Sequence, residues 1–418
     1  MKDRFELGRQ LISNQLKAVK FKLKYKRLQK KSLADLQTFT ILEECGLENV
    51  STSPKYNNAC NQQLTYPEVA IKLYQLKDVY CNIEGANFVT EDLKYVFIEE
   101  FPYISCEDAN YKAGLVVRHD TQFAYIKNIK KSQVRRFDSV FFLGGNGSFN
   151  FYHWMIELVP KLLLITNEML QEKGIDTIVV HKCVQKIDNY QWLLTQCSKH
   201  LPSAKIVYVD ANDILFAENL LFINTFNQTL YHQRKGVDGY QTTTIFNCSN
   251  IDAYRQLLKC AADKLTTTPV TGNIGNSLNQ LDIKYNKIFV LRNEDSVSRY
   301  NNRRYNQQEV FSFFKKEGFI GVYPDQLSLS EQIQLFQNAD FIVGPTGASW
   351  SNLIFASKGM KAISWLPSQL QYFDTYCSLA NLLGVDMRFL QYKTENEDIH
   401  SAYQLDLNEV IELYKQMK

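Results

Sequence analysis

The second half of the chain alternates apolar, β-rich runs with runs of helical spacing, and this alternation limits the fold more than any other feature. Strand-like runs include KIFVLR (287–292), DFIVGP (340–345) and KAISWLP (361–367). Strands that alternate with helices predict a parallel sheet with helices on its faces. We therefore expect a Rossmann-like domain, which binds its ligand at the carboxyl ends of the strands. Further strands are expected at 319–324 and 387–392, with helices at 307–317, 330–338 (opened by Ser330), 370–383 and 405–417.

The first half shows the same alternation over a shorter stretch. TIVVHK (177–182) and KIVYVD (205–210) flank a helical stretch around Trp192, which again predicts parallel strands. Before them, residues 76–145 contain five short strand-like runs, and a helical run is expected at 150–172. The sequence therefore predicts an α/β protein with two sheet-containing halves, as its 418 residues allow.

Two polar segments interrupt this pattern and are expected as loops or linkers. Residues 50–64 are turn-rich, and residues 266–286 are polar with Gly and Pro. We divide the chain into four parts: a basic arm (1–35), a first α/β domain (36–265), a Rossmann-like second domain (266–400) and a C-terminal helix (401–418).

The first 31 residues carry a charge that the rest of the chain does not share. They hold eleven basic and two acidic side chains, a net +9, whereas the remaining 36 basic and 42 acidic residues give −6. Apolar and basic residues each recur at helical spacing, which predicts a helix with an apolar stripe and a basic face. The stripe is Ile12, Leu16, Val19 and Leu23, and the basic face is Lys17, Lys20, Lys24, Arg27 and Lys31. Such a helix could lie on an anionic membrane surface, pack on its own domain or bind an anionic polymer.

Cysteines and hydropathy restrict the class of protein further. The nine cysteines are scattered without a C-x-x-C pair, so neither a disulfide framework nor a zinc cluster is expected. No apolar run is long enough for a transmembrane helix, and the first 25 residues lack a signal-peptide core, so we expect a cytoplasmic location. The acidic body argues against nucleic acid as a partner.

A Gly-rich turn, GPTGAS (344–349), joins a strand to a helix in the second half. Its small residues let a ligand approach the backbone, and free N–H groups at a helix start favour an anion. No G-K-[ST] follows, so the turn is not a P-loop. Arg292, Arg299, Arg303 and Arg304 are expected at the same rim of the sheet, where guanidinium groups bind phosphate in forked pairs. A solvated basic loop is the alternative, but the cluster and the turn together indicate a diphosphate site.

The first half holds a candidate acid–base pair. His153 and Glu157 lie four residues apart, on one face of the expected helix, and follow the loop Gly144–Asn150. A carboxylate beside an imidazole sets its tautomer and pKa, and such a pair can take a proton from a hydroxyl. A structural histidine is the alternative, but the Gly/Asn-rich loop indicates an exposed site. Which of the two residues is the base stays open.

Together these segments resemble glycosyltransferase family 61. The resemblance rests on NFYHWMIELVPKL (150–162), KIFVLRNED…NNRR (287–304) and LSLSEQIQLFQNADFIVGPTGASWSNLIFASKGMKAISW (327–365). It spans roughly residues 140–366, so the first 140 residues fall outside it. The family commonly has a His after the Gly-Pro, where this chain has Thr346. A threonine can hydrogen-bond a phosphate there but cannot carry a charge.

The resemblance implies a GT-B fold, in which two Rossmann-like domains face each other across a cleft, and an inverting glycosyl transfer. A nucleotide-sugar would be the co-substrate, with no other cofactor. No Asp-x-Asp triplet occurs, which agrees with a mechanism that needs no metal. The catalytic candidates are His153 and Glu157, and the acceptor-side candidates are Asn146, Asn150, Tyr152 and Trp154. The donor-binding candidates are Arg292, Arg303, Arg304, Gln332, Pro345, Thr346, Gly347, Ala348, Ser349 and Asn352.

The expected partners are a nucleotide-sugar donor and a glycan or lipid-linked glycan acceptor. Abundant Asn, Lys, Ile and Tyr are typical of an AT-rich bacterial genome, which favours capsule or surface-polysaccharide synthesis at the inner face of the membrane. Two other interpretations stay open: a GT-B-like transferase of another group, such as pyruvyl, and a non-catalytic nucleotide- or glycan-binding assembly subunit.

Overall fold

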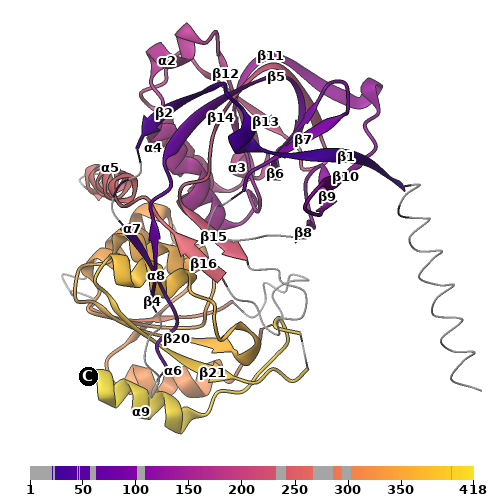
Figure 1. The fold of residues 1–418 in the computed structure, drawn as a ribbon. Coiled ribbons are helices and arrows are strands. Elements are labelled where there is room, and N and C mark those ends of the chain that lie inside the picture. Colours follow the sequence, from indigo (N-terminus) through magenta and orange to yellow (C-terminus); the bar gives the residue numbers. More distant parts are fainter. Residues whose placement is uncertain are drawn as a thin grey trace, which may run out of the picture.

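The chain forms two sheet-containing halves, which Figure 1 shows one above the other. The computed structural model describes Phe21, Gly46 and residues 24–44, 48–56, 63–100, 109–231, 242–266, 286–293, 303–396 and 398–418. The expected linker at 266–286 lies almost wholly outside the described residues, as does Arg299.

The first half contains a sheet of twelve described strands in the order β13-β12-β11-β14-β5-β6-β7-β1-β10-β9-β8, with β2 paired to β5. Its first four strands are parallel, as strand–helix alternation predicts. From β5 onward the pairing is mainly antiparallel, so the Rossmann-like part of this half is limited to four strands. The strands are β1 (Tyr25–Ser32), β2 (Phe39–Glu43), β5 (Ile71–Asn82), β6 (Gly85–Thr90), β7 (Tyr95–Ile98), β8 (Ala109–Asn110), β9 (Val116–His119), β10 (Phe123–Lys127), β11 (Val134–Leu143), β12 (Thr177–His181), β13 (Lys205–Val209) and β14 (Ile214–Ile223).

The helix expected at 150–172 is broken into three pieces. A π-helical segment, η3 (His153–Leu158), continues into a 3-10 segment, η4 (Val159–Leu164), and then into α2 (Asn167–Glu172). Pro160 has no N–H to donate, which prevents one continuous α-helix. The other helices of this half are η1 (Leu33–Asp35), η2 (Lys131–Gln133), α3 (Cys183–Lys186), α4 (Asp188–Ser198) and α5 (Cys248–Thr266).

The end of the expected basic helix is a strand instead. β1 pairs antiparallel with β10 and parallel with β7, so its backbone hydrogen bonds are made within the sheet. Leu28 is buried, while the Arg27 guanidinium lies 3.4 Å from the centre of the Phe123 ring and Lys31 lies over Tyr95. Alternation along the strand, rather than helical spacing, therefore places these cations. The other residues expected in the helix, except Phe21 and Lys24, lie outside the described part of the chain.

The segment expected as a loop at 50–64 begins and ends in strands. β3 (Glu48–Thr52) and β4 (Gln63–Pro67) pair antiparallel as a two-stranded sheet. Ser51 Oγ donates to the Asp374 carboxylate, and the backbone N–H of Thr52 donates to Ser378 Oγ at 2.9 Å. These contacts with the second half stabilise β3 as a strand, although its local sequence indicates a loop.

The predicted parallel sheet of the second half is confirmed. It has five strands in the order β18-β17-β19-β20-β21, all parallel. Chain order reverses between β17 and β19, and such a switch point is where open α/β sheets bind ligands. The strands are β17 (Lys287–Val290), β18 (Ile320–Val322), β19 (Phe341–Val343), β20 (Lys361–Pro367) and β21 (Asp386–Tyr392). The helices are α6 (Gln307–Lys316), η5 (Pro324–Gln326), α7 (Leu329–Asn338), η6 (Ala348–Phe355), η7 (Ser368–Leu370), α8 (Thr375–Leu382) and α9 (Leu407–Met417).

Helix α7 begins at Leu329, one residue earlier than expected. Ser328, not Ser330, is the N-cap, and it forms a capping box with Glu331. Helices α6 and α9 pack on one face of the five-stranded sheet, and α7, η6 and α8 pack on the other. Side chains of α9 share an apolar core with those of α6.

The two halves share one apolar core. It joins side chains under β11 and β12, such as Leu143 and Ile178, to those of β17 and β19, such as Val290 and Ile342. A buried polar seam lies beside this core. It links the two-stranded sheet of β15 (Gln228–Tyr231) and β16 (Thr242–Ile245) to Asp374.

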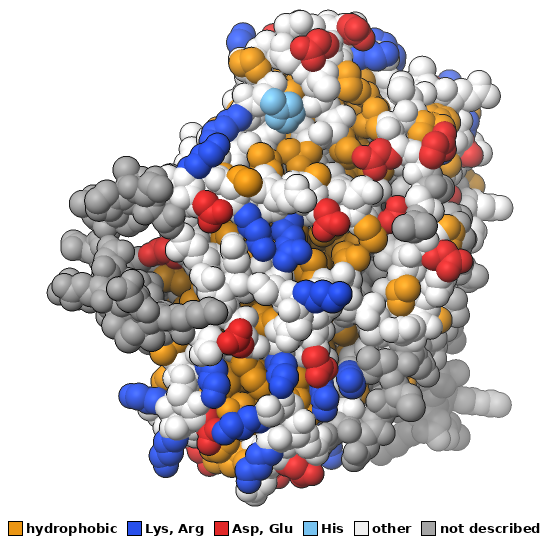
Figure 2. All heavy atoms as spheres, turned by 90° about the vertical axis from the view of Figure 1, so that its left-hand side faces the viewer, with side chains coloured by type: hydrophobic (Ala, Val, Ile, Leu, Met, Phe, Trp, Pro, Cys, Tyr) orange, Lys and Arg blue, Asp and Glu red, His pale blue; other side chains and the backbone are white. Residues whose placement is uncertain are grey.

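Figure 2 shows cationic and anionic side chains interspersed over one face of the molecule, rather than a single basic field. None of the described helices is long and apolar enough to span a bilayer.

Candidate functional site

Glycines after β11 shape the loop in front of His153. Gly147 has a φ of +74°, and a Cβ there would lie 2.4 Å from Cδ2 of His153, so only glycine fits without strain. The Gly145 N–H donates to the carbonyl of Ile83 at the end of β5. The loop is therefore fixed against the sheet and packs on the imidazole ring.

The helix that carries His153 starts on Asn150. Asn150 Oδ1 accepts the N–H of Tyr152 at 2.9 Å, and its carbonyl accepts the N–H of Trp154 at 2.9 Å. The first turn is π-helical, a form that occurs frequently at functional sites.

His153 and Glu157 form a hydrogen-bonded pair. Nδ1 of His153 lies 2.6 Å from Oε2 of Glu157, and Oε1 of Glu157 accepts the N–H of Thr229 at 3.0 Å. The Glu157 side chain is 5 % exposed and the His153 side chain 19 %. Burial alone would lower the pKa of His153, but the charge and hydrogen bond of Glu157 outweigh it and raise that pKa. Nε2 of His153 makes no hydrogen bond with a described residue, so it is the nitrogen left for an incoming group.

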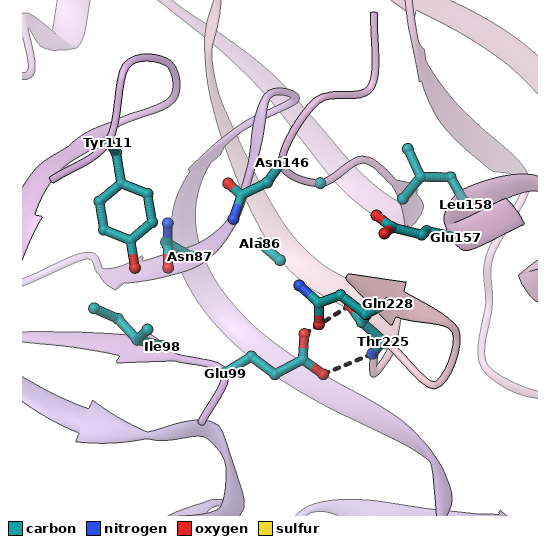
Figure 3. A pocket seen from close by; sticks show the side chains of 11 residues that line it. Ala86, Asn87, Ile98, Glu99, Tyr111, Asn146, Glu157, Leu158, Thr225 and Gln228 are labelled. Carbon is teal, nitrogen blue, oxygen red and sulfur yellow. Dashed lines mark hydrogen bonds between the residues drawn. The ribbon is translucent and has the colours of Figure 1, made fainter. Parts of the chain in front are cut away.

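A polar pocket adjoins this pair (Figure 3). Glu157 and Leu158 form one wall, and Gly145 and Asn146 of the loop form another. The pocket has a volume of about 50 Å³, above the roughly 10–15 Å³ that a cavity needs to hold one water molecule. The remaining wall residues are Ala86, Asn87, Ile98, Glu99, Tyr111, Thr225 and Gln228.

A second carboxylate and a buried lysine accompany Glu157. Glu99 accepts the N–H and the hydroxyl of Thr225, at 2.6 and 2.7 Å. Lys161 is buried, and its ammonium donates to the carbonyl of Ile223 at 2.8 Å. Burial lowers the pKa of Lys161 to about 8, against the attraction of Glu99 and Glu157. Burial raises the pKa of Glu99, and Lys161 opposes that change.

The second group of predicted residues meets at the switch point. Nη2 of Arg292 donates to the carbonyl of Thr346 at 2.9 Å, which ties the end of β17 to the Gly-rich turn after β19. A Cβ on Gly344 would lie 2.6 Å from Cβ of Val290, so glycine allows this close approach. No side chain of the described residues caps the start of η6, and Gly347, Ala348 and Ser349 are half-buried. The Thr346 contact uses its carbonyl, which any residue supplies.

Further cations lie around Arg292. Nη1 of Arg292 donates to the carbonyl of Arg303 at 3.4 Å, and Nε of Arg303 is buried without a hydrogen-bond partner among the described residues. Burial lowers the pKa of His400, and the positive charges of Arg303, Lys112 and Arg292 act in the same direction. Lys112 directly follows the pocket residue Tyr111. Lys112 of the first half and these two arginines of the second half therefore all act electrostatically on His400.

Three of the predicted site residues are buried and make hydrogen bonds within the protein. Asn352 is fully buried and donates to Gln332 at 2.7 Å, and Gln332 donates to the carbonyl of Pro324 at 2.8 Å. Both therefore position the turn around η5 and do not face solvent. Trp154 is fully buried, where its indole N–H donates to the carbonyl of Tyr190. The motif showed that these side chains are polar or aromatic, but it carried no information on burial.

The other predicted residues are placed as follows. Asn146 lines the pocket, Tyr152 is buried with its hydroxyl bonded to Thr229, and the side chain of Arg304 is exposed. Pro345 accepts the indole N–H of Trp350. In the part of the chain that the structure describes, no group of three His, Cys, Asp or Glu side chains could hold a metal ion.

Sequence reasoning missed Asn87, Glu99, Tyr111, Gln228 and His400. The first three come from strands outside the resemblance, and His400 stands alone in the sequence. For Glu99, the sequence pattern that could have indicated a site is the pair Glu99-Glu100 at the end of an apolar strand-like run.

The His153–Glu157 pair and the Arg292–Thr346 contact fall within one family match. The family model described as Glycosyltransferase 61 matches residues 151–363, from just before His153 to strand β20. No curated protein gives a significant match to the chain. The matched segment covers just over half of the 418 residues, and it contains the His153–Glu157 pair, Arg292 and the Gly-rich turn. The chain belongs to glycosyltransferase family 61.

Proposed function

We propose that the protein transfers a sugar from a nucleotide-sugar to a hydroxyl of a glycan acceptor, with inversion at the anomeric carbon. The observation that carries this proposal is the His153–Glu157 pair, in which Glu157 holds Nδ1 and leaves Nε2 for an acceptor hydroxyl. When Nδ1 of an imidazole is hydrogen-bonded to a carboxylate, the ring is held in the tautomer that leaves Nε2 unprotonated. Such a ring is a suitable general base.

In the proposed step, Nε2 of His153 takes the proton of the acceptor hydroxyl while its oxygen attacks the anomeric carbon. The bond between that carbon and the diphosphate breaks, and the nucleoside diphosphate leaves with the electron pair. Arg292, Arg303 and the uncapped start of η6 are the groups that stabilise the developing negative charge. The buried, unpartnered Nε of Arg303 is a donor to which a phosphate oxygen could bind.

The proposal includes a GT-B arrangement, with the donor mainly on the second half and the acceptor mainly on the first. The position of Lys112 next to the pocket residue Tyr111, within electrostatic reach of His400, supports a site that both halves build. We propose a leaving group held by side-chain cations and backbone N–H groups, without a resident metal.

We further propose that the protein acts in bacterial capsule or surface-polysaccharide synthesis, as a peripheral protein at the inner face of the membrane. The basic character of residues 1–24 supports this location. Because β1 begins at Tyr25, the informative deletion removes residues 1–20 and keeps the strand. Loss of sedimentation with anionic vesicles, at unchanged thermal stability, is the expected result, and unchanged sedimentation argues against the membrane role.

A screen of donors tests the function itself. Purified protein is incubated with UDP-, GDP- and CMP-sugars, with and without glycan acceptors, and the released nucleotide is measured. Release that depends on one donor class and is stimulated by an acceptor supports transfer. A second candidate function, a non-catalytic nucleotide- or glycan-binding subunit, is favoured by Thr346, which cannot carry the charge of the usual histidine. That candidate predicts nucleotide binding without release from any donor.

A further inference from the structure

The polar pocket beside Glu157 is built mainly by residues that the family match does not cover. Asn87, Glu99 and Tyr111 come from strands β6, β7 and β8 or the residue after them, all before residue 151. Figure 3 shows Asn146 and Gln228 on the walls of the same pocket as Glu99 and Glu157. The antiparallel strands of the first sheet therefore add a pocket to the site that lies within the family match.

One wall atom lacks the hydrogen bond that a buried oxygen needs. Oε1 of Gln228 is buried and accepts no hydrogen bond from a described residue. Leaving a buried acceptor unsatisfied is unfavourable, so this oxygen indicates a donor that enters the site. The neighbouring amides of Asn87 and Asn146 each present both a donor and an acceptor.

The carboxylates of the pocket are fixed before a ligand arrives. Both oxygens of Glu99 accept hydrogen bonds from Thr225, and both oxygens of Glu157 accept from His153 and Thr229. Among the residues that the structure describes, no Lys or Arg lines the pocket, and the ammonium of the buried Lys161 donates to the carbonyl of Ile223. Of the described lining residues, a ligand therefore meets two oriented carboxylates and several amides, but no cationic side chain.

We infer that this pocket binds an uncharged, hydroxyl-rich sugar unit of the acceptor and discriminates against sugars that carry a carboxylate. The inference rests on the proposed function for its ligand, a glycan. Sugar hydroxyls can donate hydrogen bonds to carboxylates and to Gln228 Oε1. They can also donate to the oxygen of a side-chain amide and accept from its NH₂ group. A uronate would bring a further carboxylate beside Glu99 and Glu157, whose attraction to the buried Lys161 is already used, and would lose its hydration without gaining a cation from the described lining residues. The pocket volume fits the hydroxyl-bearing edge of one sugar ring rather than a longer glycan.

Matched pairs of small glycosides test this inference. Methyl glucoside against methyl glucuronide, and the corresponding galactose pair, differ only in a hydroxymethyl or a carboxylate at carbon 6. Binding to the full chain is measured by ligand-observed NMR at pH 7.5 without donor. We expect at least one pair in which the neutral member binds about tenfold more tightly, which corresponds to 1.4 kcal/mol.

Two variants separate charge from packing. Glu99→Gln keeps an oxygen for the Thr225 N–H and removes the charge, so the preference for the neutral sugar should fall at least about fivefold. Gln228→Leu removes the buried acceptor, so both members of a pair should bind more weakly by a similar factor. Glu91→Gln, at an exposed glutamate of the same half, is the control and should leave the ratio unchanged.

The outcomes distinguish this inference from the proposed function. Because binding is measured without donor, it can be read even if no transfer is found. Tighter binding of the uronate by the wild type overturns the inference, and so does an unchanged ratio in folded Glu99→Gln. Transfer activity combined with either result would leave the glycosyltransferase proposal in place and remove only the role of the pocket.

Discussion

Nδ1 of His153 lies 2.6 Å from Oε2 of Glu157, while the other edge of the same ring packs on Gly147. The ring is thus held from both sides, by a carboxylate and by a backbone that leaves no room for a Cβ. Such a ring presents Nε2 in one orientation, which proton transfer from a hydroxyl requires.

The raised pKa of His153 predicts the pH dependence of the reaction. A general base must be unprotonated, so kcat/KM should rise with pH through a pKa above the ordinary value of about 6.5. In Glu157→Gln the charge that raises this pKa is gone and burial remains, so the rising limb should move to lower pH. Rate profiles from pH 5 to 9 for both proteins measure this. If the rising part of the kcat/KM profile lies at the same pH in Glu157→Gln as in the wild type, the titrating group is not His153.

Gly147→Ala should reduce turnover by displacing His153. The added Cβ would lie 2.4 Å from Cδ2 of the ring, and alanine is strained at a φ of +74°. We expect a loss of about 1–3 kcal/mol in stability and at least tenfold in rate, with nucleotide affinity retained. Gly174→Ala is the matched control, because that glycine also has a positive φ but has nothing within 4 Å of the added Cβ. Equal rates in the two variants would show that the contact between Gly147 and the His153 ring does not affect turnover.

Arg292→Ala should weaken donor binding. Arg292 joins β17 to the turn at Thr346 at the switch point of the sheet, and a hydrogen bond to a charged group contributes about 1.5–3 kcal/mol. Arg304→Ala is the comparison, because that side chain is exposed, and it should change affinity by less than about 0.5 kcal/mol. Calorimetric titration with the donor nucleotide gives both values. Similar losses in the two variants indicate a general electrostatic effect instead of a specific contact.

Asp374→Ala should destabilise the contact between the halves. The Asp374 carboxylate is buried and accepts from Thr242 Oγ1 at 2.6 Å and from the N–H and hydroxyl of Thr244 at 2.8 and 2.9 Å. Removing it leaves these donors without a partner, at a cost of about 3–5 kcal/mol. Urea denaturation measures this, and Asp374→Asn should recover part of the loss. A change below about 1 kcal/mol means that the seam contributes little to stability.

Features that depend on neighbouring residues could be predicted from the sequence. Arg292 and the turn at Thr346 each directly follow an apolar strand, and parallel strands bring their carboxyl ends to one edge. His153 and Glu157 are close in sequence, so they meet in an α- or a π-helical turn alike.

Features that depend on distant pairing could not be predicted. Arg27 and Lys31 of β1 fit a helical period, but pairing with β10, about a hundred residues later, makes the segment a strand. The pocket joins Glu99 to Thr225 across 126 positions, and nothing local in either strand indicates the other. Gln332 and Asn352 resemble ligand contacts in a motif, and only burial shows that they bind each other.

The most direct test of His153 as the base is the transfer rate of His153→Ala and Glu157→Gln at saturating donor, with donor affinity measured in parallel. We expect His153→Ala to lower the rate by about 10²–10⁴ while donor affinity is unchanged, because general-base catalysis contributes that range. We expect a smaller loss for Glu157→Gln, which keeps an acceptor for Nδ1 but removes the charge. Near-normal turnover in His153→Ala, or a larger loss in Glu157→Gln, would contradict the assignment of His153 as the base.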